Sequence, residues 1–327
     1  MSKERKKVAD IAVGDGLKGE IYRLDTITRG SDGNYNITLS DQSGQIAGII
    51  PAERFVNDYN HLLNGAVVVN GSVLVGNDSQ PVVKVRSLAL AGGDTYKANE
   101  IFSGLSPEKI KEYNDFINAS IERLISDKGL RLLVRAVLSK SMLNDLATLP
   151  ASLAYHGRYM GGALAATATV TRMVAQNVIA YNKMSNGLYK IDYDWSVLIA
   201  ASLLHMIGIP GYITNERPWR YTEAGLSRGY MSLVQEKLVS VIREKKIPVS
   251  DENLSKVLDI LACSVPRKSG IRAVTPEGRM FRAVLLNYEE IDQLAAALDS
   301  HEFSEGASYE YLRGIGYITA DKEEEVA

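Results

Sequence analysis

Residues 31–50 read SDGNYNITLSDQSGQIAGII, and this stretch decides the fold of the N-terminal part of the chain. Every second residue from Tyr35 to Leu39 is apolar, which is typical of a strand with one face in a core. The SDGN before it and the DQSG after it are turn signals, and residues 45–50 are again apolar. The stretch therefore predicts a hairpin of two strands.

Further short runs of β-branched residues surround this hairpin. They are separated by turn dipeptides such as Asn-Gly, and one helical piece interrupts them, over Glu53–Leu63. Short strands with a single helix are typical of an OB-type barrel, which we expect over residues 1–95. The remaining strands are expected at Gly19–Leu24, Ala66–Val69, Val73–Val75 and Val82–Val85.

The pattern changes from strands to helices after a predicted linker at residues 96–105. Ser106-Pro107-Glu108 begins the first helix, with serine as the N-cap and proline in the first turn. The fold class is therefore α+β multidomain, with an N-terminal OB-type β-barrel, an all-α domain over residues 106–305 and a C-terminal tail over residues 306–327. Later helices are expected at 127–146, 160–184, 194–207, 223–245, 251–263 and 277–299.

Composition excludes several classes of protein. The formal net charge of −2 gives no overall attraction to nucleic acid, so such binding requires a local basic patch. Cys263 is the only cysteine, which excludes a disulfide framework and favours a reducing, cytoplasmic location. The charged N-terminus is not a signal peptide. The apolar residues 195–210 include His205 and are expected to form a buried helix, so no membrane partner is predicted.

Four blocks of sequence, together with the hairpin of residues 31–50, resemble the YhaM-type 3′–5′ exoribonucleases, in which an OB-fold precedes a helical HD domain. The blocks are LPASLAYHGRYMGGALAATATVTRM (149–173), DWSVLIAASLLHMIG (194–208), YTEAGLSRGYM (221–231) and LLNYEEIDQL (285–294). This resemblance implies an HD-like helical domain and an ancestral metal-dependent phosphodiesterase.

Most of the family's metal ligands are replaced in this chain. The first metal His of the family aligns with Ala166 and the Glu before it with Ala165, and the Asp of the His-Asp pair aligns with Met206. Further family His positions hold Tyr230 and Asn287, while the Ser-His-His-Gly segment aligns with residues 264–267. The matching candidates that remain are His205 and Glu290, and His156 also matches a family His.

One His and one Glu do not form a catalytic metal site. A hydrolytic metal needs several convergent nitrogen and oxygen ligands to activate water, and a thioether is no substitute for a carboxylate on a hard cation. We therefore expect a pseudoenzyme with no metal and no cofactor. The alternative is a weakly bound divalent metal in a site rebuilt around His205 with Glu289, Glu290 and Asp292.

Basic and aromatic residues supply the candidate nucleic-acid contacts. Single-strand binders stack bases on aromatic rings and follow the backbone with cations. Residues 264–282 are locally basic, and cations mix with aromatics near Trp219. The candidates are Lys18, Tyr22, Arg23, Tyr35, Lys84, Arg158, Arg217, Trp219, Arg220, Arg267, Lys268 and Arg272.

Three functions stay open from the sequence. The first is non-catalytic binding of single-stranded RNA or DNA by a descendant of an HD-domain exoribonuclease. The second is a residual metal-dependent 3′–5′ exonuclease. The third is a scaffold or regulatory subunit that binds a second copy of this chain or a paralogous subunit.

Overall fold

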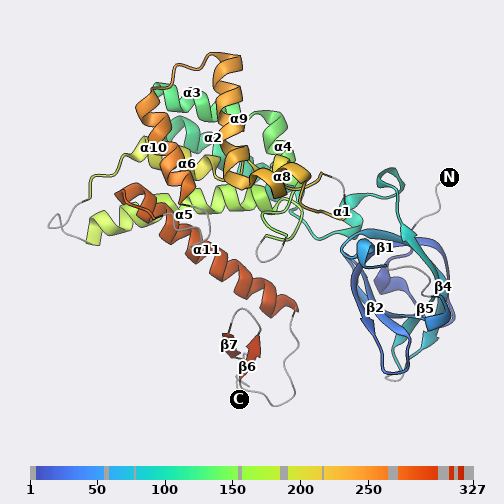
Figure 1. The fold of residues 1–327 in the computed structure, drawn as a ribbon. Coiled ribbons are helices and arrows are strands. Elements are labelled where there is room, and N and C mark those ends of the chain that lie inside the picture. Colours follow the sequence, from blue (N-terminus) through green and yellow to red (C-terminus); the bar gives the residue numbers. More distant parts are fainter. Residues whose placement is uncertain are drawn as a thin grey trace. The chain divides into compact units, whose positions relative to one another are not determined.

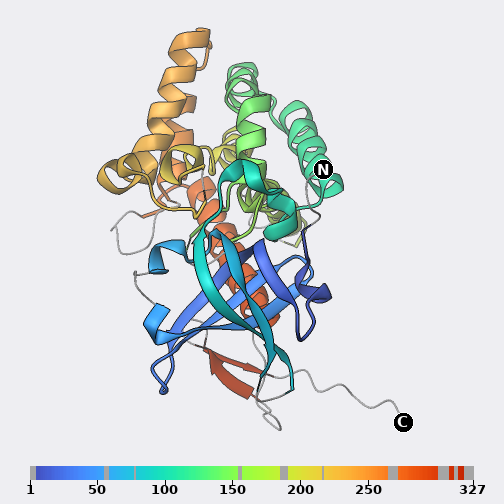
Figure 2. The same ribbon diagram turned by 90° about the vertical axis from the view of Figure 1, so that its right-hand side faces the viewer.

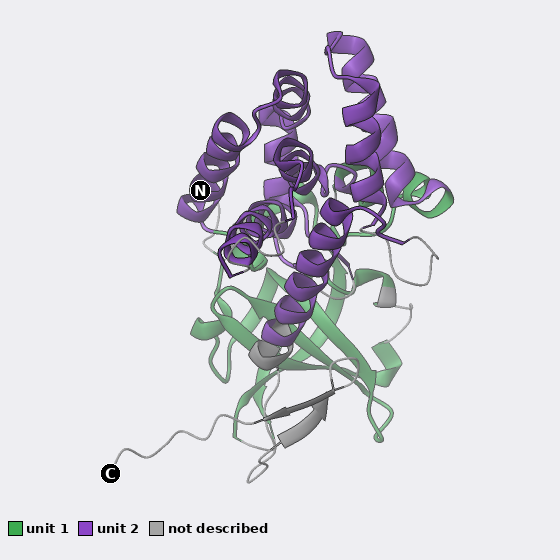
Figure 3. Ribbon diagram, turned by 90° about the vertical axis from the view of Figure 1, so that its left-hand side faces the viewer, with its two compact units in different colours: residues 1–105, 210–227 green, residues 106–209, 228–327 purple. Residues whose placement is uncertain are grey.

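The computed structural model describes residues 5–54, 59–76, 79–153, 157–184, 191–215, 217–263, 272–300, 309–312 and 316–319. The chain divides into two compact units, coloured separately in Figure 3. Unit 1 comprises Met1–Leu105 together with Pro210–Ser227, and unit 2 comprises Ser106–Ile209 together with Arg228–Ala327.

Unit 1 is built on a closed barrel of five strands, as the OB-type prediction requires. The strand order is β1-β2-β3-β5-β4, and β1 then pairs with β4 to close the barrel. Figures 1 and 2 show the strands curving around one core. All pairs are antiparallel except β3 with β5. The strands are β1 (Gly16–Arg29), β2 (Tyr35–Asp41), β3 (Gly44–Ile50), β4 (Ala66–Val75) and β5 (Pro81–Leu90).

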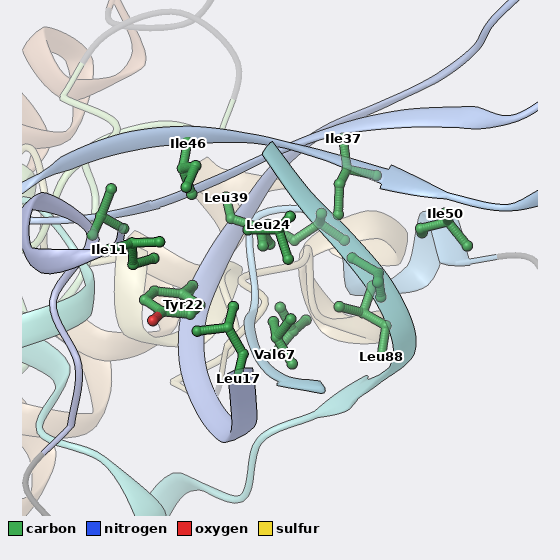
Figure 4. Packing of buried hydrophobic residues seen from close by; sticks show 14 of the residues in the cluster. Ile11, Leu17, Tyr22, Leu24, Ile37, Leu39, Ile46, Ile50, Val67 and Leu88 are labelled. Carbon is green, nitrogen blue, oxygen red and sulfur yellow. The ribbon is translucent and has the colours of Figure 1, made fainter. Parts of the chain in front are cut away.

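The barrel core consists of inward-facing apolar side chains, drawn in Figure 4. Ile37 and Leu39 of β2 are buried, as their alternation predicts. Gly71 is needed on β4 because a Cβ there would lie 2.5 Å from the main-chain oxygen of Lys84. The predicted strands Ala66–Val69 and Val73–Val75 are therefore one strand that bends at this glycine, where the register with β5 shifts.

Tyr22 belongs to this core, which corrects its assignment to a ligand surface. Its side chain is 0% exposed, and its hydroxyl donates a hydrogen bond to the main-chain oxygen of Lys6, 2.9 Å away. The cause is a bulge at Gly19, where φ is +70° and the register with β4 shifts. The extra residue turns Tyr22 inward, so no base can stack on it.

The N-terminal arm packs against the barrel. Arg5 forms an ion pair with Asp41, with 2.7 Å between Nη1 and Oδ2, and also donates to the main-chain oxygen of Glu100. The main-chain N–H of Val8 donates to the same Asp41 oxygen over 3.0 Å. Two short 3-10 helices, η2 (Ala52–Arg54) and η3 (Tyr59–Leu62), replace the helix predicted at Glu53–Leu63, whose residues 55–58 lie outside the described part.

Two segments outside the strands also belong to unit 1. The expected linker contains α1 (Ala98–Ile101), and η4 (Gly93–Thr95) lies directly before it. Residues 210–227, which were expected inside the helical domain, form a loop closed by a bridge between Ile213 and Tyr221. The short helices α7 (Ile209–Tyr212) and α8 (Glu223–Arg228) lie at the ends of this loop.

Unit 2 is helical, as the periodicity after Ser106 predicts. Side-chain N-caps fix several helix starts: the Ser106 hydroxyl accepts a hydrogen bond from the Lys109 N–H, and Asp127, Ser139 and Ser250 act in the same way. The helices are α2 (Pro107–Leu124), α3 (Lys128–Val137), α4 (Lys140–Thr148), α5 (Gly162–Met184), α6 (Trp195–Leu204), α9 (Tyr230–Lys245), α10 (Asp251–Ala262) and α11 (Pro276–Ser300). In the predicted tail, β6 (Tyr309–Leu312) pairs with β7 (Gly316–Thr319).

Helix α6 forms the centre of unit 2. Its residues from Ser196 to Leu204 are all buried, and it packs against α5 and α10. The window Trp195–Tyr212 is long and apolar enough to cross a membrane, but 78% of it is buried inside the structure. That burial is typical of the core helix of a globular protein.

Candidate nucleic-acid interface

His205, which the resemblance aligns with the His of an HD pair, is part of the packed core of unit 2. It lies at the C-terminal end of α6 and is 3% exposed. Its Nδ1 is 2.7 Å from the main-chain oxygen of Ser202, and its ring meets Phe281 edge-on at 5.8 Å between centroids. The Tyr230 hydroxyl donates a hydrogen bond to the main-chain oxygen of His205. Tyr230 therefore packs where the resemblance expects a metal-binding imidazole.

The neighbouring positions are also filled with side chains that do not bind hard metals. Ala165, Ala166 and Met206 are buried, at 3%, 1% and 7% exposure. Tyr230 lies so close to Gly208 that a Cβ on this glycine would be 2.9 Å from the tyrosine ring. Within the described ranges, no group of three or more His, Cys, Asp or Glu residues is placed to hold a metal ion.

The acidic candidates on α11 do not converge on His205 by any described contact. Glu290 is exposed. Burial, together with the negative charge of Glu290, raises the pKa of Glu289 to about 7. Asp292 instead accepts a hydrogen bond from the Gly157 N–H over 2.6 Å and so holds the loop before α5. His156 lies outside the described residues.

Several nucleic-acid candidates lie on the surface of one or the other unit. Lys18 on β1 and Lys84 on β5 are exposed, and Tyr35 on β2 is partly exposed with the Arg29 guanidinium 6.0 Å from its ring centroid. Arg158 and Arg272 are exposed on unit 2. Arg267 and Lys268 lie outside the described residues.

Arg217 and Trp219 form a compact cluster with aromatic residues of unit 1. The Arg217 guanidinium carbon lies 3.7 Å from the ring centroid of Phe102 and 4.5 Å from that of Trp219. The Phe102 and Trp219 ring centroids are 6.5 Å apart, and Tyr96 lies 6.1 Å from Phe102. Phe102 is 3% exposed, whereas Arg217, Trp219 and Tyr96 are partly exposed. We call these four residues the arginine–aromatic cluster.

The positive charge of Arg217 lacks a carboxylate partner among the described residues. Burial is the main cause that lowers the pKa of Arg217 to about 10; Tyr96 opposes this shift and Arg23 adds to it. Its Nη1 is buried without a hydrogen-bond acceptor. Aromatic rings attract a cation but accept no strong hydrogen bond. Among the described residues, the Nη1 group of Arg217 therefore has a positive charge and no strong hydrogen-bond acceptor.

The other arginines near this cluster already have partners. Arg23 forms an ion pair with Asp25 through its Nε. The Nη2 of Arg220 donates to the main-chain oxygen of His61 over 2.7 Å. Pro218 packs on Gly65, where a Cβ would lie 3.3 Å from the proline Cδ. Arg220 and Pro218 thus fix the loop on the barrel.

Sequence reasoning found Arg217 and Trp219 but missed Phe102 and Tyr96. Both aromatics lie in or beside the segment that was expected to be a linker. The sequence did offer one signal. Two aromatic residues, Tyr96 and Phe102, lie in one short segment between the barrel and the first long helix. No pattern of local spacing links residue 102 to residue 217, because the loop folds back onto the barrel.

Comparison with known proteins identifies no family. No protein-family model matches the chain, and no curated protein matches it. A solved structure described as "Structural mimicry for functional antagonism" is similar at TM-score 0.22 and 15% identity, over 28% of this chain and 46% of that one. The crystal structure of asparaginyl-tRNA synthetase from Pyrococcus horikoshii complexed with asparaginyl-adenylate is similar at TM-score 0.24 and 10% identity, over 76% of this chain and 68% of that one. This chain therefore spans less than half of the first structure, and similarities this weak carry no functional argument.

Proposed function

We propose that this protein binds single-stranded nucleic acid without cleaving it, and that unit 1 makes the contact. The observation that carries the proposal is Arg217, a partly buried cation packed on Phe102 and Trp219 with no described carboxylate partner. A guanidinium matches the geometry of a phosphate and binds it with charge-assisted hydrogen bonds.

Trp219 supplies the second element of such a site. A partly exposed indole offers a ring on which a base can stack, and stacking of this kind contributes about 1–3 kcal/mol per base. A cation beside an aromatic platform suits an unpaired base with its phosphate, because duplex bases are stacked on one another and are not free. The closed five-stranded barrel that carries the cluster is compatible with this function.

The non-catalytic part of the proposal rests on the core around His205. The resemblance to YhaM-type exoribonucleases supports descent from an HD-domain enzyme, and the packing of Tyr230, Met206 and Phe281 near His205 supports loss of its chemistry. A residual metal-dependent nuclease is the alternative. It would need ligands that the described residues do not bring together.

Fluorescence of Trp219 tests the binding. The chain has two tryptophans, so the Trp195→Phe variant leaves Trp219 as the single reporter. We expect short single-stranded RNA or DNA oligomers to quench it saturably at micromolar protein, and more weakly as salt rises. A labelled oligomer incubated with Mn²⁺ should keep its length. Absence of saturable, salt-sensitive binding to any oligomer would end the proposal.

A further inference from the structure

A small pocket of about 290 Å³ lies on the barrel of unit 1, apart from the arginine–aromatic cluster. It is bounded by the start of β3, by residues of the β4–β5 hairpin and by the N-terminal arm. The side chains used in the argument below are Val8, Gln45, Ile46, Gln80, Pro81 and Val82.

The pocket has an apolar floor and two primary amides at its rim. Val8 and Ile46 are each 6% exposed and form part of the barrel core, while Gln45 and Gln80 are exposed. Neither amide side chain has a hydrogen-bond partner among the described residues. None of the described residues that line the pocket carries a charge. These side chains suit a neutral ligand that has apolar faces and polar edges.

The backbone beside the pocket adds further polar groups. The parallel ladder between β3 and β5 extends from Ala47 and Val82 to Ile49 and Lys84. Gln45 precedes this ladder, so in the described pairing the edge of β3 that faces β5 has no strand partner there. An extended edge of this kind presents main-chain donors and acceptors, which are groups that can pair with the polar edge of a ligand.

The pocket and the arginine–aromatic cluster adjoin the same turn. Gln42, in the turn between β2 and β3, donates from Nε2 to the main-chain oxygen of Phe102 over 3.2 Å. Gln45, three residues later, lines the pocket. The turn between β2 and β3 thus contacts the main chain of one cluster residue and leads directly into the strand that lines the pocket.

We propose that the pocket binds one unpaired nucleobase and that Gln45 and Gln80 read its hydrogen-bonding edge. A nucleobase is neutral, has apolar faces for Ile46 and Pro81, and carries donors and acceptors that primary amides can pair with. This inference rests on the proposed function, because it makes the pocket a base-selective subsite of the same nucleic-acid surface.

Uncharged nucleosides test the pocket separately from the phosphate contact. The full-length protein is titrated with adenosine, guanosine, cytidine and uridine in turn, and the side-chain amide resonances of Gln45 and Gln80 are followed by NMR. We expect one nucleoside to shift both resonances saturably at roughly millimolar concentration, to a similar extent in low and high salt, because no ionic contact is involved.

Variants assign the effect to the two amides. Gln45→Ala combined with Gln80→Ala, followed through the main-chain amide resonances of Ile46 and Val82, should weaken nucleoside binding about tenfold, since two hydrogen bonds are lost. Gln235→Ala, at an exposed position on α9, is the matched control and should change nothing. If no nucleoside produces saturable shifts, or if the double variant binds as tightly as the wild type, the inference is wrong.

The same titrations separate this inference from the proposed function. Nucleoside binding without oligomer binding would support the pocket and contradict the nucleic-acid function. Oligomer binding that depends on Arg217, with no nucleoside effect at either glutamine, would contradict the pocket and leave the function intact.

Discussion

The Nδ1 atom of His205 lies 2.7 Å from the main-chain oxygen of Ser202, one turn earlier in α6. Because a carbonyl oxygen can only accept, Nδ1 is the nitrogen that carries the proton. This bond and the Phe281 ring hold the imidazole inside the core of unit 2. The retained histidine is thus a structural residue, although the resemblance would make it a metal ligand.

Manganese is expected to leave the protein unaffected. A ligand that binds the folded state raises its stability, and the described residues offer no set of three or more metal ligands. Thermal unfolding with and without millimolar MnCl₂ should therefore give the same midpoint, and elemental analysis should find no stoichiometric metal. A rise of several degrees that is lost in a His205→Ala variant would contradict the pseudoenzyme hypothesis.

Gly208→Ala tests the packing of Tyr230 and Val234 against Gly208. A Cβ at Gly208 would lie 2.9 Å from the Tyr230 ring and 2.9 Å from a methyl carbon of Val234. Overpacking of this kind costs about 1–3 kcal/mol, so urea unfolding should show a lower free energy of unfolding. Gly16→Ala is the control, because nothing lies within 4 Å of a Cβ there. Equal stability of the two variants would show that Tyr230 does not pack against Gly208.

The ion pair between Arg5 and Asp41 predicts a pH-dependent contribution to stability. Burial raises the pKa of Asp41, but hydrogen bonds from Ser43, Arg5 and the Val8 N–H outweigh it, so the pKa lies below its ordinary value of 3.8. The charged form therefore stabilises the fold above that value, and the contribution is lost as the pH falls through the folded-state pKa.

Asp41→Asn measures this contribution. At pH 7 the variant should lose about 2 kcal/mol of unfolding free energy, the scale of hydrogen bonds to a charged group. The difference from the wild type should narrow as the pH drops below 3.8, where the wild-type carboxylate also becomes neutral. A difference that does not change between pH 7 and pH 3 would contradict the assigned pKa direction.

The raised pKa of Glu289 predicts that stability changes with pH in the direction opposite to that expected from Asp41. Its pKa is about 7 in the folded protein because of burial and the charge of Glu290, so the folded state holds this proton more tightly than the unfolded state. Stability should fall as the pH rises from about 4.5 to about 7. Glu289→Gln should then be more stable than the wild type at pH 8, by about 1–3 kcal/mol, and equal to it near pH 4. Denaturant titrations at both pH values measure the difference in unfolding free energy. A Glu289→Gln variant that is less stable than the wild type at pH 8 would contradict the raised pKa of Glu289.

Regular periodicity made much of the fold predictable. The expected helix 160–184 corresponds to α5 (Gly162–Met184), and 251–263 corresponds to α10 (Asp251–Ala262). Two predicted helices are interrupted. Residues 127–146 break where Ser139 caps α4, and residues 223–245 break at Gly229, whose φ is +73°. Serine and glycine are both residue types that occur at helix starts. The apolar periodicity continues across Ser139 and Gly229, so it predicted one helix where the structure has two.

The site was less predictable because it depends on tertiary contacts. Arg217 and Trp219 stand out in the sequence as a cation beside an aromatic residue, yet their partner Phe102 lies in a segment expected to be a linker. Tyr22 was chosen as a ligand-surface residue because it is aromatic, and the bulge at Gly19 turns it into the core. Neither the folding-back of a loop nor the position of a bulge is encoded in hydrophobic periodicity.

Salt dependence of oligomer binding tests the central claim that Arg217 contacts a phosphate. For single strands, each neutralised phosphate contributes about 0.7 to the slope of log affinity against log salt. Arg217→Gln should therefore weaken binding and make the slope shallower by about 0.7. Arg243→Gln, at an exposed position on α9, should leave both quantities as in the wild type. If wild-type protein binds no oligomer, or if Arg217→Gln keeps the wild-type affinity and slope, the account is contradicted.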